Sequence, residues 1–238
     1  MSPAPGKRTT RRGAANAAVA GGRKDAGAPP ASTGGPAPAE RGRSKDKRDA
    51  ILRAAVRVFA RRGFHACRVS DIAEEAGVGY GLVYHYFASK DEVLDTLFLE
   101  RWEVMLDAIR ALDGRPLTAS EKLGGIASFI VDSYRRDPEL MKVIIVEVTR
   151  AANTFGGRHL GRISEAYQLI AAIVESAQRE GAFRREIDAG FAAMAFYGVI
   201  EQVLTGWIFG LLPTGEEDFE RAKDLVVETV CGGLQAAA

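Results

Sequence analysis

Apolar side chains recur at helical spacing almost without interruption from Ser44 to the end of the chain. In the first such stretch five apolar residues recur at three- and four-residue spacings, which places them on one helix face: Ile51, Leu52, Ala55, Val58 and Phe59. Strand-like alternation is confined to 142–148, and Pro138 just before that run favours a helix there as well. The sequence therefore predicts an all-α fold.

Glycine, proline and polar clusters divide this pattern into segments. After a first helix that ends at Gly63, they predict helices over about 69–76, 79–86, 90–112, 119–135, 138–152, 159–180, 188–211 and 216–235. We expect residues 44–90 to form a small three-helix domain and residues 91–238 to form a helical bundle.

Residues 1–43 differ in composition from the rest of the chain. They contain almost no large apolar side chains, so they cannot bury enough surface to offset the entropy of ordering, and we expect a disordered tail. This tail has 8 basic and 2 acidic residues, 44–90 has 9 and 5, and the remainder has 15 and 24. A basic N-terminal part on an acidic body favours a polyanionic partner at that end, although a merely solvated tail explains the same charge.

The segment Arg68–Phe87 carries the most specific pattern. Ile72 lies on the inner face of the helix predicted over 69–76, and Val83 and Phe87 lie on the inner face of the one predicted over 79–86. Gly77, between them, suits the left-handed backbone of a tight turn. Two short helices joined in this way are typical of a DNA-binding helix-turn-helix, whose second helix enters the major groove.

A family resemblance rests on the string Asp71-Ile-Ala-Glu-Glu-Ala-Gly-Val-Gly-Tyr-Gly-Leu-Val-Tyr-His-Tyr-Phe-Ala-Ser-Lys90. This string is similar to the helix-turn-helix of the TetR family of repressors, and the resemblance covers about residues 45–95. It implies a helix-turn-helix DNA-binding domain over 44–90 and a ligand-binding and dimerisation domain over 91–238. It also implies a ligand-responsive transcriptional repressor that binds a palindromic operator as a homodimer and is released by a small effector.

The resemblance further implies which residues contact double-stranded DNA. Residues of the recognition helix would lie near base edges or the backbone, Lys90 would contact a phosphate at the start of the next helix, and Arg68 and Ser70 would contact phosphates from the second helix. The expected DNA-contacting residues are Arg68, Ser70, Gly79, Tyr80, Gly81, Leu82, Tyr84, His85 and Lys90.

The opening of the recognition helix departs from the family pattern. Many relatives have Ser-x-Gly-Thr where this chain has Gly79-Tyr80-Gly81-Leu82, and many have Ser or Thr at the position of Arg68. Two hydroxyl groups are therefore missing from the opening of that helix. We expect base readout to depend on Tyr80 and on contact of Leu82 with thymine methyl groups.

The segment 191–211 is apolar on all sides and has Glu201 as its one charged residue. Such a helix is expected to be buried on both sides. Its small residues would let a second helix approach closely: Ala192, Ala195, Gly198, Thr205 and Gly206. Together with the last predicted helix it resembles one half of the family's four-helix dimer interface. A helix buried wholly within one monomer is the alternative.

We expect a small hydrophobic effector to bind among the central helices. The body resembles the FadR-type branch of the family, which responds to fatty acids and acyl-CoA, although a drug-type or other hydrophobic inducer fits as well. Aromatic and methionine residues at helical spacing also make up ordinary cores. The candidate ligand-binding residues are Trp102, Met105, Phe129, Tyr134, Met141, Ile145, Tyr167, Ile170 and Trp207.

Other functional classes have little support. The 3 histidines and 2 cysteines are scattered, and no nucleophile motif occurs, so we expect no enzyme activity, catalytic residue, metal or cofactor. No secretory leader and no uncharged membrane-spanning run is predicted, and two isolated cysteines favour the reducing cytoplasm. A ligand-independent architectural DNA-binding protein, or an activator, is the alternative to a repressor.

Overall fold

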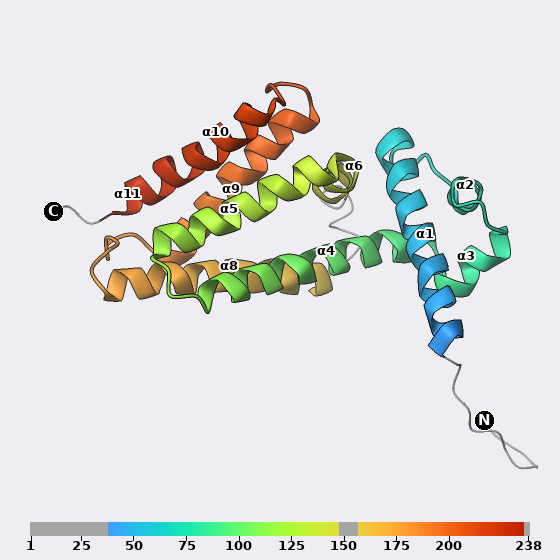
Figure 1. The fold of residues 1–238 in the computed structure, drawn as a ribbon, viewed down its shortest axis with the longest axis horizontal. Coiled ribbons are helices and arrows are strands. Elements are labelled where there is room, and N and C mark those ends of the chain that lie inside the picture. The colour runs from blue at the N-terminus through green and yellow to red at the C-terminus, as the bar shows by residue number, and fades with distance from the viewer. Residues whose placement is uncertain (1–37, 148–156, 236–238) are drawn as a thin grey trace, which may run out of the picture.

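The computed structural model describes residues 38–147 and 157–235, and their secondary structure is helical apart from one isolated bridge between Phe183 and Gln235 (Figure 1). The predicted all-α fold is confirmed. The first helix begins at Pro38, six residues before the expected Ser44, so this part of the predicted tail is helical. The prediction of disorder for the rest of the tail concerns residues that lie outside the described ones.

Three helices form an N-terminal head at one end of the molecule (Figure 1): α1 (Pro38–Arg62), α2 (Val69–Glu75) and α3 (Tyr80–Tyr86). Ile51 and Phe59 of α1, Ile72 of α2 and Val83 of α3 are almost completely buried and form the centre of this head. Gly63 ends α1 with φ of 78°, a left-handed conformation that a residue with a Cβ adopts at a cost. The predicted helix boundaries in the head are correct to within one residue from Val69 onward.

The body is a bundle of longer helices. Its segments are α4 (Lys90–Asp113), α5 (Ala119–Arg136), α6 (Pro138–Lys142), the π-helical η1 (Val143–Glu147), α8 (Gly157–Arg179), α9 (Ala189–Ile208), α10 (Glu216–Val226), the π-helical η2 (Val227–Cys231) and α11 (Gly232–Leu234). Helix α4 leaves the head and runs lengthwise along the body beside α8 (Figure 1).

Two of the predicted helices contain a π-helical turn. The helix expected over 138–152 is α6 followed by η1, with residues 148–152 outside the described part of the chain. The helix expected over 216–235 contains η2 in its second half. Both turns consist largely of β-branched residues, which crowd the preceding turn of an α-helix. The helical prediction was therefore right, but the sequence pattern did not reveal the wider turn.

Polar side chains join the head to the body at several places among the described residues. The Arg48 guanidinium lies 2.6 Å from a Glu100 carboxylate oxygen, which joins α1 to α4. The Lys142 ammonium donates to the Ala60 carbonyl at 3.0 Å, which joins α6 to the last turn of α1. A change in the position of α4 or α6 within the body therefore acts directly on α1.

Candidate nucleic-acid interface and dimer face

The turn between α2 and α3 has the backbone that the sequence predicts. Gly77 has φ of +65°, and the Val78 amide donates to the Ala73 carbonyl at 3.0 Å, which closes the turn. Val83 and Phe87 are buried beneath α3, as expected. This is the geometry of a helix-turn-helix, with α3 in the place of the recognition helix.

Ion pairs hold α2 against α1. The Glu75 carboxylate is bound by two arginines of α1, Arg57 at 2.7 Å and Arg61 at 2.8 Å. The hydrogen bond from Arg61 is the largest cause that lowers the pKa of Glu75, and the one from Arg57 is the next. Asp71 accepts from the Arg68 backbone amide at 2.7 Å, which is the main cause of its lowered pKa, and it pairs with Arg62 at 3.0 Å. These contacts fix α2, which in turn positions α3.

The outer face of α3 is aromatic and solvent-exposed. Tyr80 and Tyr84 are 53% and 43% exposed, and His85 beside them is exposed as well. A Cβ added at Gly79 or Gly81 would meet nothing within 4 Å, so the surface around them is open. A groove of DNA can therefore approach the start of α3 without steric hindrance from the chain itself.

The other expected DNA-contacting residues lie in two environments. Arg68 and Ser70, at the start of α2, are exposed. Leu82 and Lys90 are half-buried. Contact of all nine residues with DNA stays a prediction, since the structure contains no nucleic acid, but seven of the nine are accessible on the surface of the head.

Lys90 has a structural role that the sequence did not indicate. Its ammonium donates to the carbonyls of Phe64, His65 and Cys67 at 2.9, 3.3 and 3.1 Å and lies 4.6 Å from the centre of the Phe64 ring. It therefore ties the α1–α2 connection to the start of α4. The expected phosphate contact would have to compete with, or be added to, these three hydrogen bonds.

The start of α4 carries a second feature that sequence reasoning missed. The Ser89 hydroxyl accepts from the Glu92 amide at 3.1 Å, and the Glu92 carboxylate accepts from the Ala88 amide at 2.6 Å. Ser-x-x-Glu is the sequence signal of such an N-terminal cap, so it was available at positions 89–92. The cap fixes where α3 ends and α4 begins.

The residues expected to bind the effector fall into two aromatic clusters and the general core. In one cluster Trp207 stacks on Tyr134 at 5.3 Å and meets Phe219 edge-on at 4.8 Å. In the other, Tyr197 lies 5.9 Å from Trp102 and 5.7 Å from Tyr167. The remaining candidates are buried or half-buried in the body: Met105, Phe129, Met141, Ile145 and Ile170. Within the described residues they do not form a single group.

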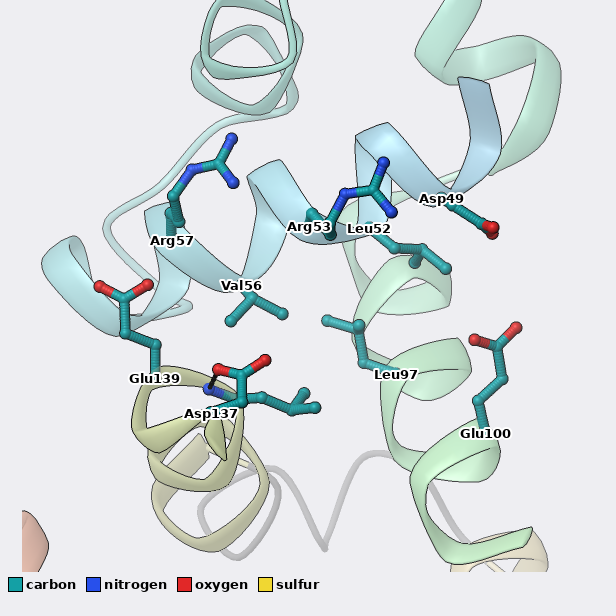
Figure 2. Close-up of a pocket in the computed structure, with 10 residues that line it drawn as sticks. Asp49, Leu52, Arg53, Val56, Arg57, Leu97, Glu100, Asp137 and Glu139 are labelled. Carbon is teal, nitrogen blue, oxygen red and sulfur yellow. Dashed lines mark hydrogen bonds between the residues drawn. The ribbon is translucent and has the colours of Figure 1, made fainter. Parts of the chain in front are cut away.

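A cleft of about 340 Å³ lies where the head meets the body, between α1, α4 and α6 (Figure 2). Its floor is apolar, with Leu52 and Val56 of α1 facing Leu97 of α4. Charged side chains surround this floor: Asp49, Arg53, Arg57, Glu100, Asp137 and Glu139. The head and the body are therefore incompletely packed at this junction. Sequence reasoning did not anticipate this cleft, because its residues come from three separate helices.

Helix α9 has one buried side and one open side. Ile200, Leu204 and Trp207 face the core, whereas Phe191 and Met194 are 75% and 57% exposed. By length and composition alone α9 could cross a membrane, but its buried side packs against α8, α5 and α10, as a core helix of a bundle does. The exposed apolar side is the part that a neighbouring molecule could cover.

A shallow groove of about 650 Å³ runs along this open side of α9, and apolar atoms predominate in it. Of the five small residues that the sequence indicated, Ala195 and Gly198 line this groove, whereas Ala192 and Gly206 are buried on the other side of the helix. The residues that line the groove are Ala195, Gly198, Val199, Glu201, Gln202, Val203 and Leu212.

Comparison with known proteins agrees with both domains. Residues 51–97 match the family of bacterial regulatory proteins described as tetR family, and residues 120–230 match the tetracyclin repressor-like C-terminal domain. The fatty acid metabolism regulator protein of Bacillus subtilis is 28% identical over 185 residues, 77% of this chain and 93% of that protein. The transcriptional repressor NicS of Pseudomonas putida is 29% identical over 59% of this chain and 67% of its own.

Solved structures show the same fold. The fatty acid degradation regulator FadR of Bacillus halodurans superposes with a TM-score of 0.72 at 27% identity, over 80% of this chain and 97% of its own. FadR of Bacillus subtilis, solved in complex with stearoyl-CoA, superposes with a TM-score of 0.67 at 24% identity, over 79% and 99%. With an exposed recognition helix, a helical body and both domain matches, the chain belongs to the TetR family of helix-turn-helix, DNA-binding transcriptional regulators, which are not enzymes.

Proposed function

We propose that this protein is a cytoplasmic repressor that binds a palindromic operator as a homodimer and is released by a long-chain acyl effector, an acyl-CoA or a related amphiphile. The observation that carries the proposal is the pairing of two exposed surfaces on one chain. One is the aromatic face of α3, and the other is the apolar open side of α9.

The short recognition helix supports a dimer. Helix α3 has seven residues and reaches only a few base pairs, which is too little for a specific site on its own. Two heads related by a twofold axis read two half-sites of opposite orientation, which is why such operators are palindromic. The open side of α9 supplies the surface through which two copies would associate.

The effector class is supported by relatives and by the interior of the body. A fatty acid metabolism regulator and a stearoyl-CoA complex stand among the similar proteins. The body contains two buried aromatic clusters, built around Trp207 and Tyr197, of the kind that lines sites for apolar ligands. The effector must bind the DNA-free arrangement of the heads more tightly than the DNA-bound one. Equal affinity for both would leave the equilibrium between the two arrangements unchanged.

The test is a binding titration of the purified full chain on the promoter fragment of its own gene, followed by fluorescence anisotropy. We expect submicromolar affinity for that fragment and at least tenfold weaker affinity for a scrambled one. Stearoyl-CoA should release the fragment, whereas CoA at the same concentration should not. Equal affinity for both fragments would refute specific operator binding. DNA binding that is not weakened by any acyl ligand tested would refute the proposed effector class.

A further inference from the structure

Arg101 is a cation in the body for which the described residues provide no anion. It lies on α4, is half-buried, and holds its guanidinium carbon 5.1 Å from the centre of the Phe129 ring on α5. Among the residues that the structure describes, none forms a hydrogen bond or an ion pair with it. By contrast, Arg110, nine residues further along α4, pairs with Asp107 at 2.9 Å and also with Glu165 of α8.

The surroundings of Arg101 disfavour an unpaired charge. Burial is the main cause that lowers the pKa of Arg101, and the positive charge of Arg136 lowers it further. The carboxylate of Asp137 acts in the opposite direction, but it accepts the Leu140 amide at 3.0 Å as the cap of α6. A guanidinium stays protonated in proteins, so Arg101 keeps its charge at this site and is available to pair with an anion.

The groups on the adjoining helices do not supply that anion. Trp102, next to Arg101, packs on Tyr197 of α9, and burial raises the pKa of Tyr197, which keeps its phenol neutral. Glu201, one turn further along α9, is half-buried, burial raises the pKa of its carboxyl, and among the described residues it forms no hydrogen bond or ion pair with Arg101. The surroundings of Arg101 are therefore largely apolar and aromatic, and Arg136 adds a second positive charge rather than a counter-ion.

We propose that Arg101 binds the acidic group, carboxylate or phosphate, of the amphiphilic effector whose apolar chain lies among the aromatic residues of the body. An arginine pairs with either group through two parallel hydrogen bonds. The inference rests on the proposed function and specifies the ligand end that the body recognises. Because Arg101 is on α4, three turns from Lys90, a ligand bound there acts on the helix that carries the head.

The experiment compares wild type, Arg101→Gln and Arg101→Lys, with Arg115→Gln as a control for an exposed arginine. Each is titrated by calorimetry with stearoyl-CoA, stearate and stearyl alcohol, which share one chain and differ in the end group. We expect Arg101→Gln to weaken the binding of the acidic ligand about tenfold or more and that of the alcohol less than twofold. Arg101→Lys should lie between, and the control should match wild type.

Thermal unfolding without ligand provides the second readout. Removal of an uncompensated charge should leave the melting temperature of Arg101→Gln unchanged or raise it, whereas loss of a structural arginine would lower it. A loss of affinity for stearoyl-CoA alone identifies a phosphate as the bound group, a loss for stearate alone identifies the carboxylate, and a loss for both shows that the site accepts either anion.

Three results would overturn the inference. The first is equal affinity of the wild type for stearyl alcohol and for the acidic ligands. The second is an Arg101→Gln variant whose ligand affinities match those of the wild type. Either result would leave the proposed function intact. A wild type that binds none of the three chains would remove the acyl effector itself, and the role of Arg101 with it.

Discussion

The hydroxyls of Tyr80 and Tyr84 are joined by a hydrogen bond of 3.0 Å, and the two rings meet edge-on with centres 4.9 Å apart. The two residues are one turn apart on the exposed face of α3, so this pair is the part of the head that a DNA groove would meet first. This hydrogen bond with Tyr80 is also the main cause that raises the pKa of Tyr84.

Substitution of either tyrosine by phenylalanine should separate backbone contact from base readout. If Tyr84 contacts the DNA backbone, Tyr84→Phe weakens binding to all duplexes by a similar factor of about 3 to 10, the value of one hydrogen bond. Tyr80→Phe should instead alter the preference among operator variants. Anisotropy titrations on the operator and on single-base variants measure both effects, and a uniform loss from Tyr80→Phe would contradict its assignment to base readout.

The same pair predicts a pH effect. The raised pKa keeps the Tyr84 phenol neutral above its ordinary value of about 10, so a phenolate that would repel phosphates forms only at higher pH. The stabilisation linked to this shift is complete below pH 10 and is lost as the pH rises through the folded-state pKa. In Tyr80→Phe the pKa of Tyr84 should fall towards 10, which an ultraviolet absorbance titration detects. An unchanged value would mean that the hydroxyl pair does not form in solution.

Two glycines of the helix-turn-helix should respond to alanine in opposite directions. Gly77→Ala puts a Cβ at φ of +65° and should destabilise the protein by about 1 kcal/mol, although nothing lies within 4 Å of that Cβ. Gly81→Ala, equally open but inside α3, should stabilise it by about 0.5–1 kcal/mol. Chemical denaturation measures both, and shifts of the same sign would contradict the turn geometry.

Much of the head was predictable from its sequence because its determinants are local. The apolar spacing around Ile72 and Val83 and the need for a left-handed residue at Gly77 are readable within twenty residues. The role of Lys90 was not, because its partners are carbonyls more than twenty residues earlier in the chain. The same reason explains the candidate effector residues: helical spacing shows that Trp102 and Trp207 face inward, but not that they enter different clusters.

Lys90→Ala tests whether that lysine acts on DNA or on the fold. Loss of three hydrogen bonds to a charged donor should destabilise the protein by about 2 kcal/mol or more. If the ammonium also contacts a phosphate, the slope of log Kd against log salt concentration falls by about 0.9. Exposed Arg53, substituted in the same way, is the control for a general loss of charge. A variant with wild-type stability would contradict the contacts that the structure shows.

Acid should loosen α2 from α1. The arginine hydrogen bonds hold the pKa of Glu75 below its usual 4.5, so the stabilisation they provide is present above that pH and is lost as the pH falls through the lowered folded-state value. Glu75→Gln removes the titrating group and should flatten the dependence of melting temperature on pH as the pH falls below 4.5. Parallel curves for the variant and wild type would mean that Glu75 does not contribute in that range.

The open side of α9 provides the test of the dimer. Met194→Glu places a charge on an apolar side chain that is 57% exposed in the single chain, so it should disrupt association while leaving the fold intact. Val104→Glu, at a 51% exposed position on α4, is the matched control. Sedimentation velocity should show a monomer for the first variant and a dimer for the second. Because one head alone reads too few base pairs, the monomer should also lose operator affinity at least a hundredfold. A dimeric Met194→Glu with full operator binding would place the subunit interface on another surface.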